Sequence, residues 1–308
     1  MNASEWLASR AVALQNTGKA RAPVAAGLVG APMSRLSLSG SAAWASPAAV
    51  RRALSRFHTY DGMHSLELEE LNLLDFGDVA GDQAETDPAT ARMRLEELVA
   101  KEMAQCELIT ILGGDNSITR HGFSALLRTH PDLGLITFDA HHDTRPLASG
   151  PTNGTPVREL ILGGLQGNRV AQIGINPLGN GGDYARWTKE QGVHLFYSPE
   201  IHHKGVGATL FDALTRLRKA GAHTFYVDFD MDVLDRAFAP GCPGSLPGGM
   251  HPAQLAHAAF QLGRDPNVVA ADFTEVDALA DVNEITVRAT AYTLLNLYFG
   301  RLSGRKGA

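Results

Sequence analysis

Apolar residues along this chain occur in short continuous runs separated by longer segments of mixed polarity. A run of roughly four to eight Val, Ile, Leu or Phe residues indicates a strand that is buried on both faces. Several intervening segments repeat apolar residues every three or four positions, as at Leu95, Leu98, Val99 and Met103, which is typical of an amphipathic helix. This alternation predicts an α/β fold, with a mainly parallel sheet and helices on both of its faces.

The same pattern gives approximate bounds for each element. It predicts strands at residues 23–30, 71–79, 108–112, 133–138, 170–175, 193–197, 224–229 and 268–273. It predicts helices at residues 46–57, 86–104, 117–130, 184–191, 206–220, 252–262 and 285–302. Because no repeat or low-complexity linker interrupts the alternation, residues 1–308 are expected to form a single domain, with residues 1–21 as an irregular or partly helical N-terminal arm.

Composition and charge restrict the class of protein. The chain has 44% apolar and 19% charged residues, which are globular values. Its net charge of −6 argues against nucleic acid as a partner, since phosphate binding needs a basic surface. Cys106 and Cys242 make no disulfide framework, so a cytoplasmic location is expected. No signal-peptide pattern is present and no apolar run approaches the roughly 18 residues that cross a membrane, so no membrane partner is expected.

Potential metal ligands follow the predicted strand at 133–138. Asp139, His141 and Asp143 are spaced by two, and alternate side chains on an extended segment point the same way. The carboxyl ends of strands are also where ligands bind in open α/β sheets. Two carboxylates and an imidazole at one point would be costly without a counter-charge, because like charges repel and burial adds to the cost. A divalent cation removes that cost; the alternative is a polar loop with a core histidine.

Further candidates follow three other predicted strands. A Gly-Gly-Asp-Asn-Ser loop at residues 113–117 follows the strand at 108–112. Four closely spaced aspartates lie at and after the end of the strand at 224–229, namely Asp228, Asp230, Asp232 and Asp235. Glu275 follows the strand at 268–273. The glycine loop is explained equally well as a tight turn before a helix cap. For the aspartates, the alternative to a cation site is a solvated acidic edge. We expect Asp228 to be a hydrogen-bonded structural residue.

The ligand types indicate which metal and which chemistry to expect. Carboxylates with a single strong histidine favour Mn²⁺ over Zn²⁺, since oxygen ligands suit the harder ion. The carboxylates suffice for two ions that share a bridging aspartate. Two such ions lower the pKa of a water between them and make hydroxide available near neutral pH. The implied reaction is a hydrolysis.

Four motifs occur in the order Gly-Gly-Asp-Asn-Ser, Asp-Ala-His-His-Asp, Asp-Met-Asp-Val-Leu-Asp and Glu-Val-Asp. Together they resemble the ureohydrolase family of arginases, agmatinases and their relatives. Within it, Arg145 and the segments 150–156 and 239–243 are similar to formimidoylglutamases, which split N-formimino-L-glutamate into L-glutamate and formamide in histidine degradation. The resemblance implies a three-layer α/β/α fold, two Mn²⁺ per subunit and a homo-oligomer, usually a trimer or hexamer.

The family's ligand pattern can be placed on matching positions of this sequence. The resemblance implies that Asp139 and Asp230 bridge the two metals. It also implies that His141 and Asp232 bind one metal and that Asp143 binds the other.

The resemblance also indicates which residues act on the substrate. Glu275 matches the carboxylate that holds amidine or guanidine nitrogens, so Glu275, Asp143 and His141 are the candidate catalytic residues. Two positions differ from arginases. Asn116 replaces a histidine ligand, and an amide binds metal more weakly than imidazole does, so the metal site near Asn116 is expected to be weak. Asn153 replaces a histidine often described as a proton shuttle, and an amide cannot titrate.

The position of one arginine indicates an acidic substrate. Arg145 follows Asp143 by two residues, and a guanidinium binds a carboxylate through two parallel hydrogen bonds. The alternative is a surface ion pair. Thr152 and Asn153 are further substrate-binding candidates, whereas we expect Arg158 to start a helix or to lie at a subunit contact. Nothing basic flanks Cys242, which is therefore expected to shape the pocket rather than act as a nucleophile.

The sequence therefore predicts a binuclear manganese hydrolase that acts on N-formimino-L-glutamate, a small-molecule substrate. His142 is a nearby candidate for protonating the leaving amine, although its neighbouring position on an extended segment would face away. Two rival functions remain. One is an agmatinase- or guanidinobutyrase-type amidinohydrolase that releases urea. The other is a weakly metallated, non-catalytic relative that only binds its ligand.

Overall fold

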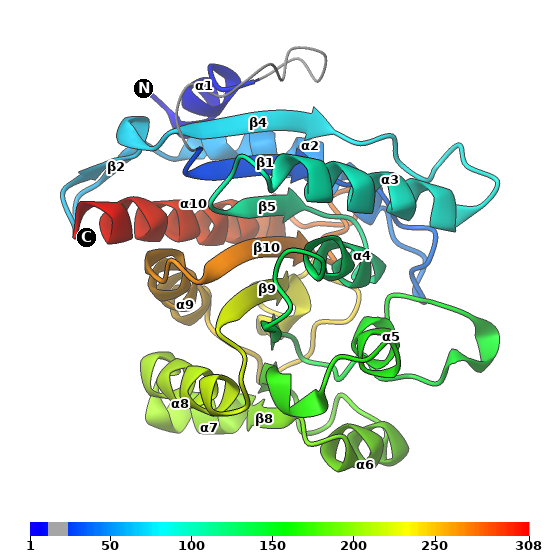
Figure 1. Cartoon of the computed structure of the whole chain (residues 1–308). Helices are drawn as coiled ribbons and strands as arrows, with labels where there is room; N and C mark the ends of the chain where they lie inside the picture. Colours follow the sequence, from blue (N-terminus) through cyan, green and yellow to red (C-terminus); the bar gives the residue numbers. More distant parts are fainter. Residues whose placement is uncertain (12–23, 308) are drawn as a thin grey trace.

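The computed structural model, which describes residues 1–11 and 24–307, is built on one large sheet (Figure 1). Eight parallel strands lie in the order β4-β1-β5-β10-β9-β6-β7-β8. They are β1 (Ala26–Gly30), β4 (Leu73–Asp78), β5 (Ile109–Leu112), β6 (Leu133–Phe138), β7 (Val170–Ile175), β8 (His194–Tyr197), β9 (Thr224–Asp230) and β10 (Val268–Thr274). A small antiparallel hairpin consists of β2 (Tyr60–Asp61) and β3 (Leu66–Glu67).

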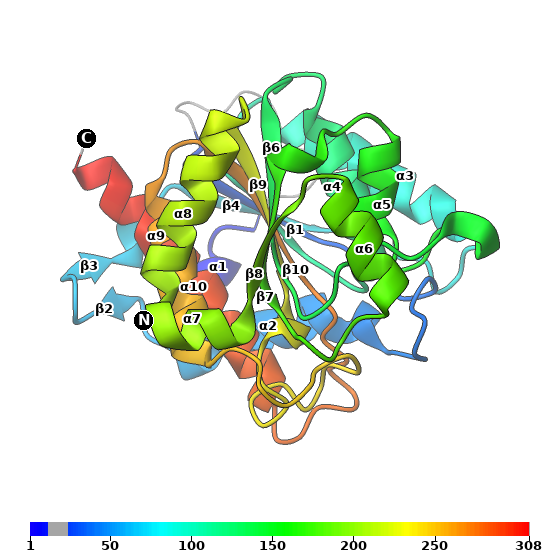
Figure 2. The same cartoon turned by 90° about the horizontal axis from the view of Figure 1, so that it is seen from below.

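Helices cover both faces of the sheet, which gives the three layers that were expected (Figure 2). One face carries α2 (Ser46–Ala53), α7 (Ser198–Lys204), α8 (Val206–Lys219), α9 (Pro252–Arg264) and α10 (Ile285–Lys306). The other face carries α3 (Pro88–Glu102), α4 (Ser117–Leu126), α5 (Pro156–Leu162) and α6 (Gly182–Glu190). The short α1 (Ala3–Ala8) packs against the α2 side, where its Trp6 is buried. Short 3₁₀ helices cover Ala43–Ala45, Leu54–Arg56, Leu68–Glu70, Leu147–Ser149, Gly167–Arg169 and Met231–Val233.

A row of aromatic side chains crosses the centre of the sheet at the end of its strands. Phe138, Phe229 and Phe273 are register partners on β6, β9 and β10. Their rings stack with centroid distances of 5.2 Å and 4.9 Å and are fully buried. Packing of this kind fixes the relative positions of the strand ends. The next residue on each strand therefore starts from a rigid platform.

The strand predictions agree closely with the structure. The strands predicted at 133–138 and 170–175 are β6 and β7 with the same bounds. The predicted helix at 117–130 was too long, because α4 ends at Leu126, and the last helix continues four residues past the predicted 302, to Lys306. Residues 12–21 of the predicted arm and residue 23 of the first predicted strand lie outside the described residues.

The sequence pattern missed the hairpin β2–β3 and the helix α7, and of α5 it foresaw only a helix start at Arg158, which lies in the first turn. Each of these helices has seven residues and begins with a proline in its first turn. Two turns are too few for a helical period to stand out from the surrounding sequence.

Candidate metal centre and substrate pocket

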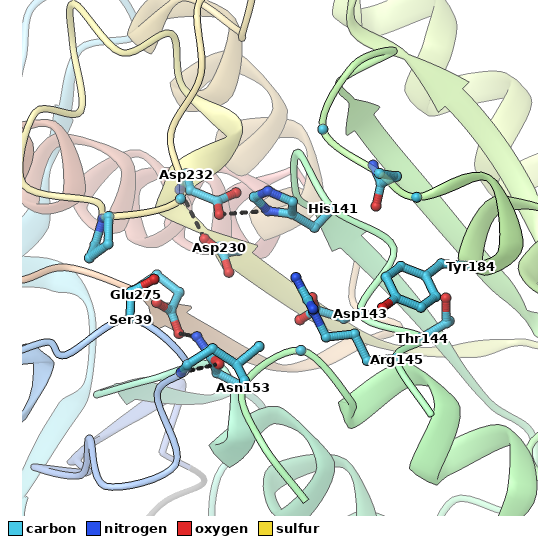
Figure 3. A pocket seen from close by; sticks show the side chains of 17 residues that line it. Ser39, His141, Asp143, Thr144, Arg145, Asn153, Tyr184, Asp230, Asp232 and Glu275 are labelled. Carbon is cyan, nitrogen blue, oxygen red and sulfur yellow. Dashed lines mark hydrogen bonds and ion pairs between the residues drawn. The ribbon is translucent and has the colours of Figure 1, made fainter. Parts of the chain in front are cut away.

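A pocket of about 140 Å³, open to solvent, lies at the carboxyl ends of the central strands (Figure 3). Residues at or after the ends of β6, β9 and β10 line it, and Asn116, in the loop after β5, donates its backbone N–H to the lining residue Glu275. The carboxylates of Asp143, Asp230, Asp232 and Glu275 face this one cavity from different elements. A parallel sheet explains the convergence, since all of its strands end at the same edge.

Two overlapping groups of side chains could each hold a metal ion. The first consists of Asp139, His141 and Asp232, and the second of Asp139, Asp143 and Asp230. Within each group the candidate ligand atoms lie within 4.8 Å of one another. Asp139 belongs to both groups, which is the arrangement that a bridging carboxylate requires.

Backbone hydrogen bonds orient these carboxylates. The His141 N–H donates to Asp139 Oδ1 at 2.6 Å, and the Asp232 N–H donates to Asp230 Oδ1 at 2.9 Å. Gly244 packs so closely that an added Cβ would lie 2.4 Å from Asp232 Oδ2, so only glycine fits there. This contact could not be foreseen, because Gly244 belongs to none of the motifs, although it follows Asp232 by only 12 residues.

The buried carboxylates of the site repel one another, and a cation would reduce that repulsion. Burial, and then the neighbouring carboxylates, raise the pKa of Asp139 and Asp230 well above the usual value. The Asp232 charge raises the pKa of His141 to about 12, and the His141 Nδ1 atom lies 2.9 Å from Asp232 Oδ2. Asp139 Oδ2 is buried and has no hydrogen-bond partner among the described residues. Cations bound to this set would supply the missing partner and reduce the repulsion, so the residues fit a metal site.

Two site carboxylates stand on strained backbone. Asp143 has a φ of 50° and Glu275 a φ of 66°, in the left-handed region that residues with a side chain seldom adopt. Asp143 therefore does not follow the simple alternation of an extended segment on which its prediction rested. Its side chain nevertheless joins Asp139 and Asp230, because the left-handed turn redirects it.

Glu275 is held from two sides. Its Oε1 atom accepts a hydrogen bond from the Asn116 N–H at 2.6 Å and another from Asn153 Nδ2 at 3.0 Å. Its carboxyl lines the pocket. Burial raises the pKa of Glu275 to about 8, with the Asp115 charge as the next cause. A cationic group in the pocket would stabilise the ionised form.

The amide of Asn116 turns its nitrogen, not its oxygen, toward the site. Asn116 Nδ2 donates to Asp143 Oδ2 at 2.7 Å. Its oxygen accepts from the hydroxyl groups of Thr119 and Thr274, at 2.7 Å and 3.2 Å. The expected role as a metal ligand would require the amide to rotate and to give up these bonds, whereas the present orientation holds Asp143.

The structure separates the substrate-binding candidates. Arg145 and Asn153 line the pocket. Thr152 is not among the lining residues, and its hydroxyl accepts from the Gly154 N–H within the turn at 152–155. Sequence reasoning missed several further lining residues, among them Ser39, Asn180, Tyr184 and Gly244. They lie in loops and in α6, outside every motif.

Three other residues of interest lie outside the pocket. His142 is buried, and its Nδ1 atom lies 2.8 Å from Gln172 Oε1 on β7, so it faces away from the pocket. Cys242 is fully buried, and burial raises the pKa of its thiol well above the usual value, which agrees with a packing role. Asp228 lies within β9, where it pairs in register with Asp272, and both of its buried carboxylate oxygens have no hydrogen-bond partner among the described residues, so the expectation of a hydrogen-bonded residue was wrong.

The fold and the site together define the class of this protein. A parallel sheet whose central strands end in two overlapping groups of potential metal ligands is the arrangement of an α/β metallohydrolase. The family model of the arginases matches residues 24–300, and the chain belongs to the arginase family. No helix among the described residues has the length and apolar character needed to cross a membrane.

Individual relatives are similar over most of the chain. A formimidoylglutamase from Halalkalibacterium halodurans is 39% identical over 279 residues, which is 89% of this chain and 86% of the relative. A guanidinopropionase from Pseudomonas aeruginosa is 33% identical over 88% of this chain and 85% of its own length. The crystal structure of formimidoylglutamase from Bacillus subtilis superposes with a TM-score of 0.88 at 29% identity, covering 96% of this chain and 92% of that one.

Proposed function

We propose that this protein hydrolyses N-formimino-L-glutamate to L-glutamate and formamide. The observation that carries the proposal is the exposed guanidinium of Arg145 at the pocket beside an acidic metal centre. Within residues 1–11 and 24–307, no carboxylate forms an ion pair with Arg145. A substrate with carboxylates would supply that partner. The similarity to formimidoylglutamases supports the same substrate.

We also propose that the site holds two Mn²⁺ ions. Asp139 and Asp230 would bridge them, His141 and Asp232 would bind one, and Asp143 would bind the other. The support is the oxygen-rich ligand set, which suits Mn²⁺. Bound there, the ions supply Lewis acidity and an acidified water.

The chain's own residues would bind and orient the substrate. Glu275 holds the cationic amidine, and its charge is stabilised by that cation. Arg145 binds a substrate carboxylate, and Asn153 keeps Glu275 in place through the bond to Oε1. Asn153 also accepts from the Leu38 N–H at 2.9 Å, which ties the loop at the pocket entrance to the same point.

Product analysis tests the proposal. The purified, Mn²⁺-treated protein would be incubated with N-formimino-L-glutamate, and formamide and glutamate would be measured. Release of both in equal amounts supports the proposed reaction. The second candidate function releases urea from a guanidino acid, and the similarity to a guanidinopropionase favours testing 3-guanidinopropionate beside it. Urea formation without turnover of the formimino compound would replace the proposed function.

Removal of Arg145 should affect substrate binding more than chemistry. For Arg145→Ala we expect KM for N-formimino-L-glutamate to rise about ten- to hundredfold, since a charge-assisted pair is lost. The value of kcat should change little. Arg128→Ala removes an exposed arginine just beyond α4, at the opposite edge of the sheet, and serves as the control. An unchanged KM in Arg145→Ala would show that Arg145 does not bind the substrate.

Metal removal should make stability depend on pH. Burial raises the folded-state pKa of Asp143 to about 7 and that of Glu275 to about 8, from ordinary values of 3.8 and 4.5. Their contribution to stability is therefore fully present below about pH 4 and is lost as pH rises through these folded-state values. We expect Tm of the chelator-treated protein to fall between about pH 5.5 and 8.5, and Mn²⁺ to raise Tm most at the higher pH. Equal Mn²⁺ effects at both pH values would contradict this.

Assembly as a trimer or hexamer and a cytoplasmic location stay predictions of the sequence.

A further inference from the structure

The Arg145 side chain is confined between Tyr184 of α6, which no sequence motif contains, and Gly154 of the segment 150–156. Its guanidinium carbon lies 5.4 Å from the centre of the Tyr184 ring. On another side is Gly154, where an added Cβ would lie 2.7 Å from Arg145 Cδ. The backbone N–H of Arg145 also donates to the backbone carbonyl of Gly154 at 3.0 Å. The side chain thus occupies a slot formed by an aromatic ring and a glycine.

Tyr184 belongs to a face of α6 that is anchored to the same segment. Thr188, one turn further along α6, places its hydroxyl 2.7 Å from that of Thr144. The guanidinium carbon of Arg158 lies 3.9 Å from the centre of the Trp187 ring. Arg158 Nε donates to the Thr144 carbonyl at 2.7 Å. Residues three and four apart share one helix face. This face of α6 therefore holds the backbone next to Arg145 as well as its side chain.

We propose that Tyr184 is a positioning residue for Arg145, and that α6 thereby sets the preference of the pocket for an acidic substrate. This inference rests on the proposed function. A ring against the flat face of a guanidinium leaves the N–H donors free in the guanidinium plane, where a carboxylate binds. Without the Tyr184 ring beside it, the exposed Arg145 side chain would populate many rotamers. Binding a substrate would then cost the conformational entropy of ordering that side chain.

The alternative is that Tyr184 binds the substrate through its own hydroxyl, because Tyr184 also lines the pocket. The two roles differ in what Tyr184→Phe does. A positioning ring is retained in that variant, whereas a substrate hydrogen bond is lost. They differ again when Arg145 is absent, since a residue that acts through Arg145 then has nothing to position.

The experiment is a double-mutant cycle on KM for N-formimino-L-glutamate. For Tyr184→Leu we expect KM to rise about three- to fivefold, the range of an exposed cation–π contact, with kcat unchanged. Tyr184→Phe should stay within about twofold of wild type. In the Arg145→Ala background, adding Tyr184→Leu should change KM no further. Gly154→Ala, which intrudes on Arg145 Cδ, should raise KM as Tyr184→Leu does.

Controls separate this inference from folding defects and from the proposed function. Tyr60→Leu removes an exposed tyrosine of the β2–β3 hairpin and should leave KM unchanged. Thermal unfolding checks that each variant is folded. If wild type does not turn over N-formimino-L-glutamate, the proposed function fails, and the same cycle is measured by calorimetric binding of L-glutamate. A Tyr184→Leu effect that persists without Arg145, an equal effect of Tyr184→Phe, or the absence of any effect would overturn the inference.

Discussion

Asp230→Ala should abolish turnover, with kcat lower by about a thousandfold or more, because a two-metal site contributes several kcal/mol to the transition state. Asp230 lies in the group with Asp139 and Asp143, and its loss leaves the two proposed ions with one bridging carboxylate, Asp139, in place of two. Metal content measured by mass spectrometry should fall below that of wild type. The kinetic assay uses saturating substrate, so that weaker binding cannot account for the loss.

Although Asp230→Ala should lose turnover, its metal-free form should be at least as stable as metal-free wild type. Burial and the neighbouring carboxylates raise the pKa of Asp230, so its charged form is costly in the metal-free protein. Tm of metal-free Asp230→Ala at about pH 8 should therefore equal or exceed that of metal-free wild type. Asp212→Ala removes an exposed aspartate of α8 and is the matched control. An active Asp230→Ala variant with normal metal content would refute the metal assignment.

Glu275→Gln should lower kcat/KM by about a hundredfold, which corresponds to the loss of a charge-assisted hydrogen bond. The amide oxygen can keep the bonds from Asn116 and Asn153. In the variant, an NH₂ group stands in place of the second carboxylate oxygen of Glu275, the one that does not accept these two bonds. A cationic amidine offers only donors, so it loses both an acceptor and a counter-charge.

A matched variant and a stability measurement complete this test. Glu200→Gln changes an exposed glutamate of α7 and should retain wild-type activity. Because burial raises the pKa of Glu275 to about 8, removing its charge should not lower Tm of the metal-free protein above that pH. If Glu275→Gln keeps wild-type kcat/KM, Glu275 does not hold the amidine.

The sequence was most informative where backbone and burial act locally. The strands β6 and β7 could be predicted to the residue, because a strand buried on both faces is made mainly of apolar residues. The change from Phe138 to Asp139 marks the point where the buried strand gives way to the site. Short elements such as α5 carry no period of their own and depend on contacts with the rest of the fold.

The candidate site could be predicted as a set of residues but not as a geometry. The motifs identified Asp139, His141, Asp143, Asp230 and Asp232. The alternation rule could not foresee the left-handed turn at Asp143, which depends on the surrounding structure. Nor could it foresee that Asn116 presents its nitrogen to the site, because the hydroxyls that fix the amide belong to Thr119 on α4 and Thr274 on β10.

By itself the sequence determined the alternation of strands and helices and the types of side chain at the strand ends, because both depend on residues that are close together in the sequence. Only the tertiary structure decided which carboxylates lie close enough to share an ion, which way an amide points and which ring lies beside Arg145. Tyr184 is 39 positions beyond Arg145, and the contact between them exists because β6 and β7 are neighbours and α6 follows β7. Such contacts depend on sheet order and helix placement, which the whole chain sets together through packing.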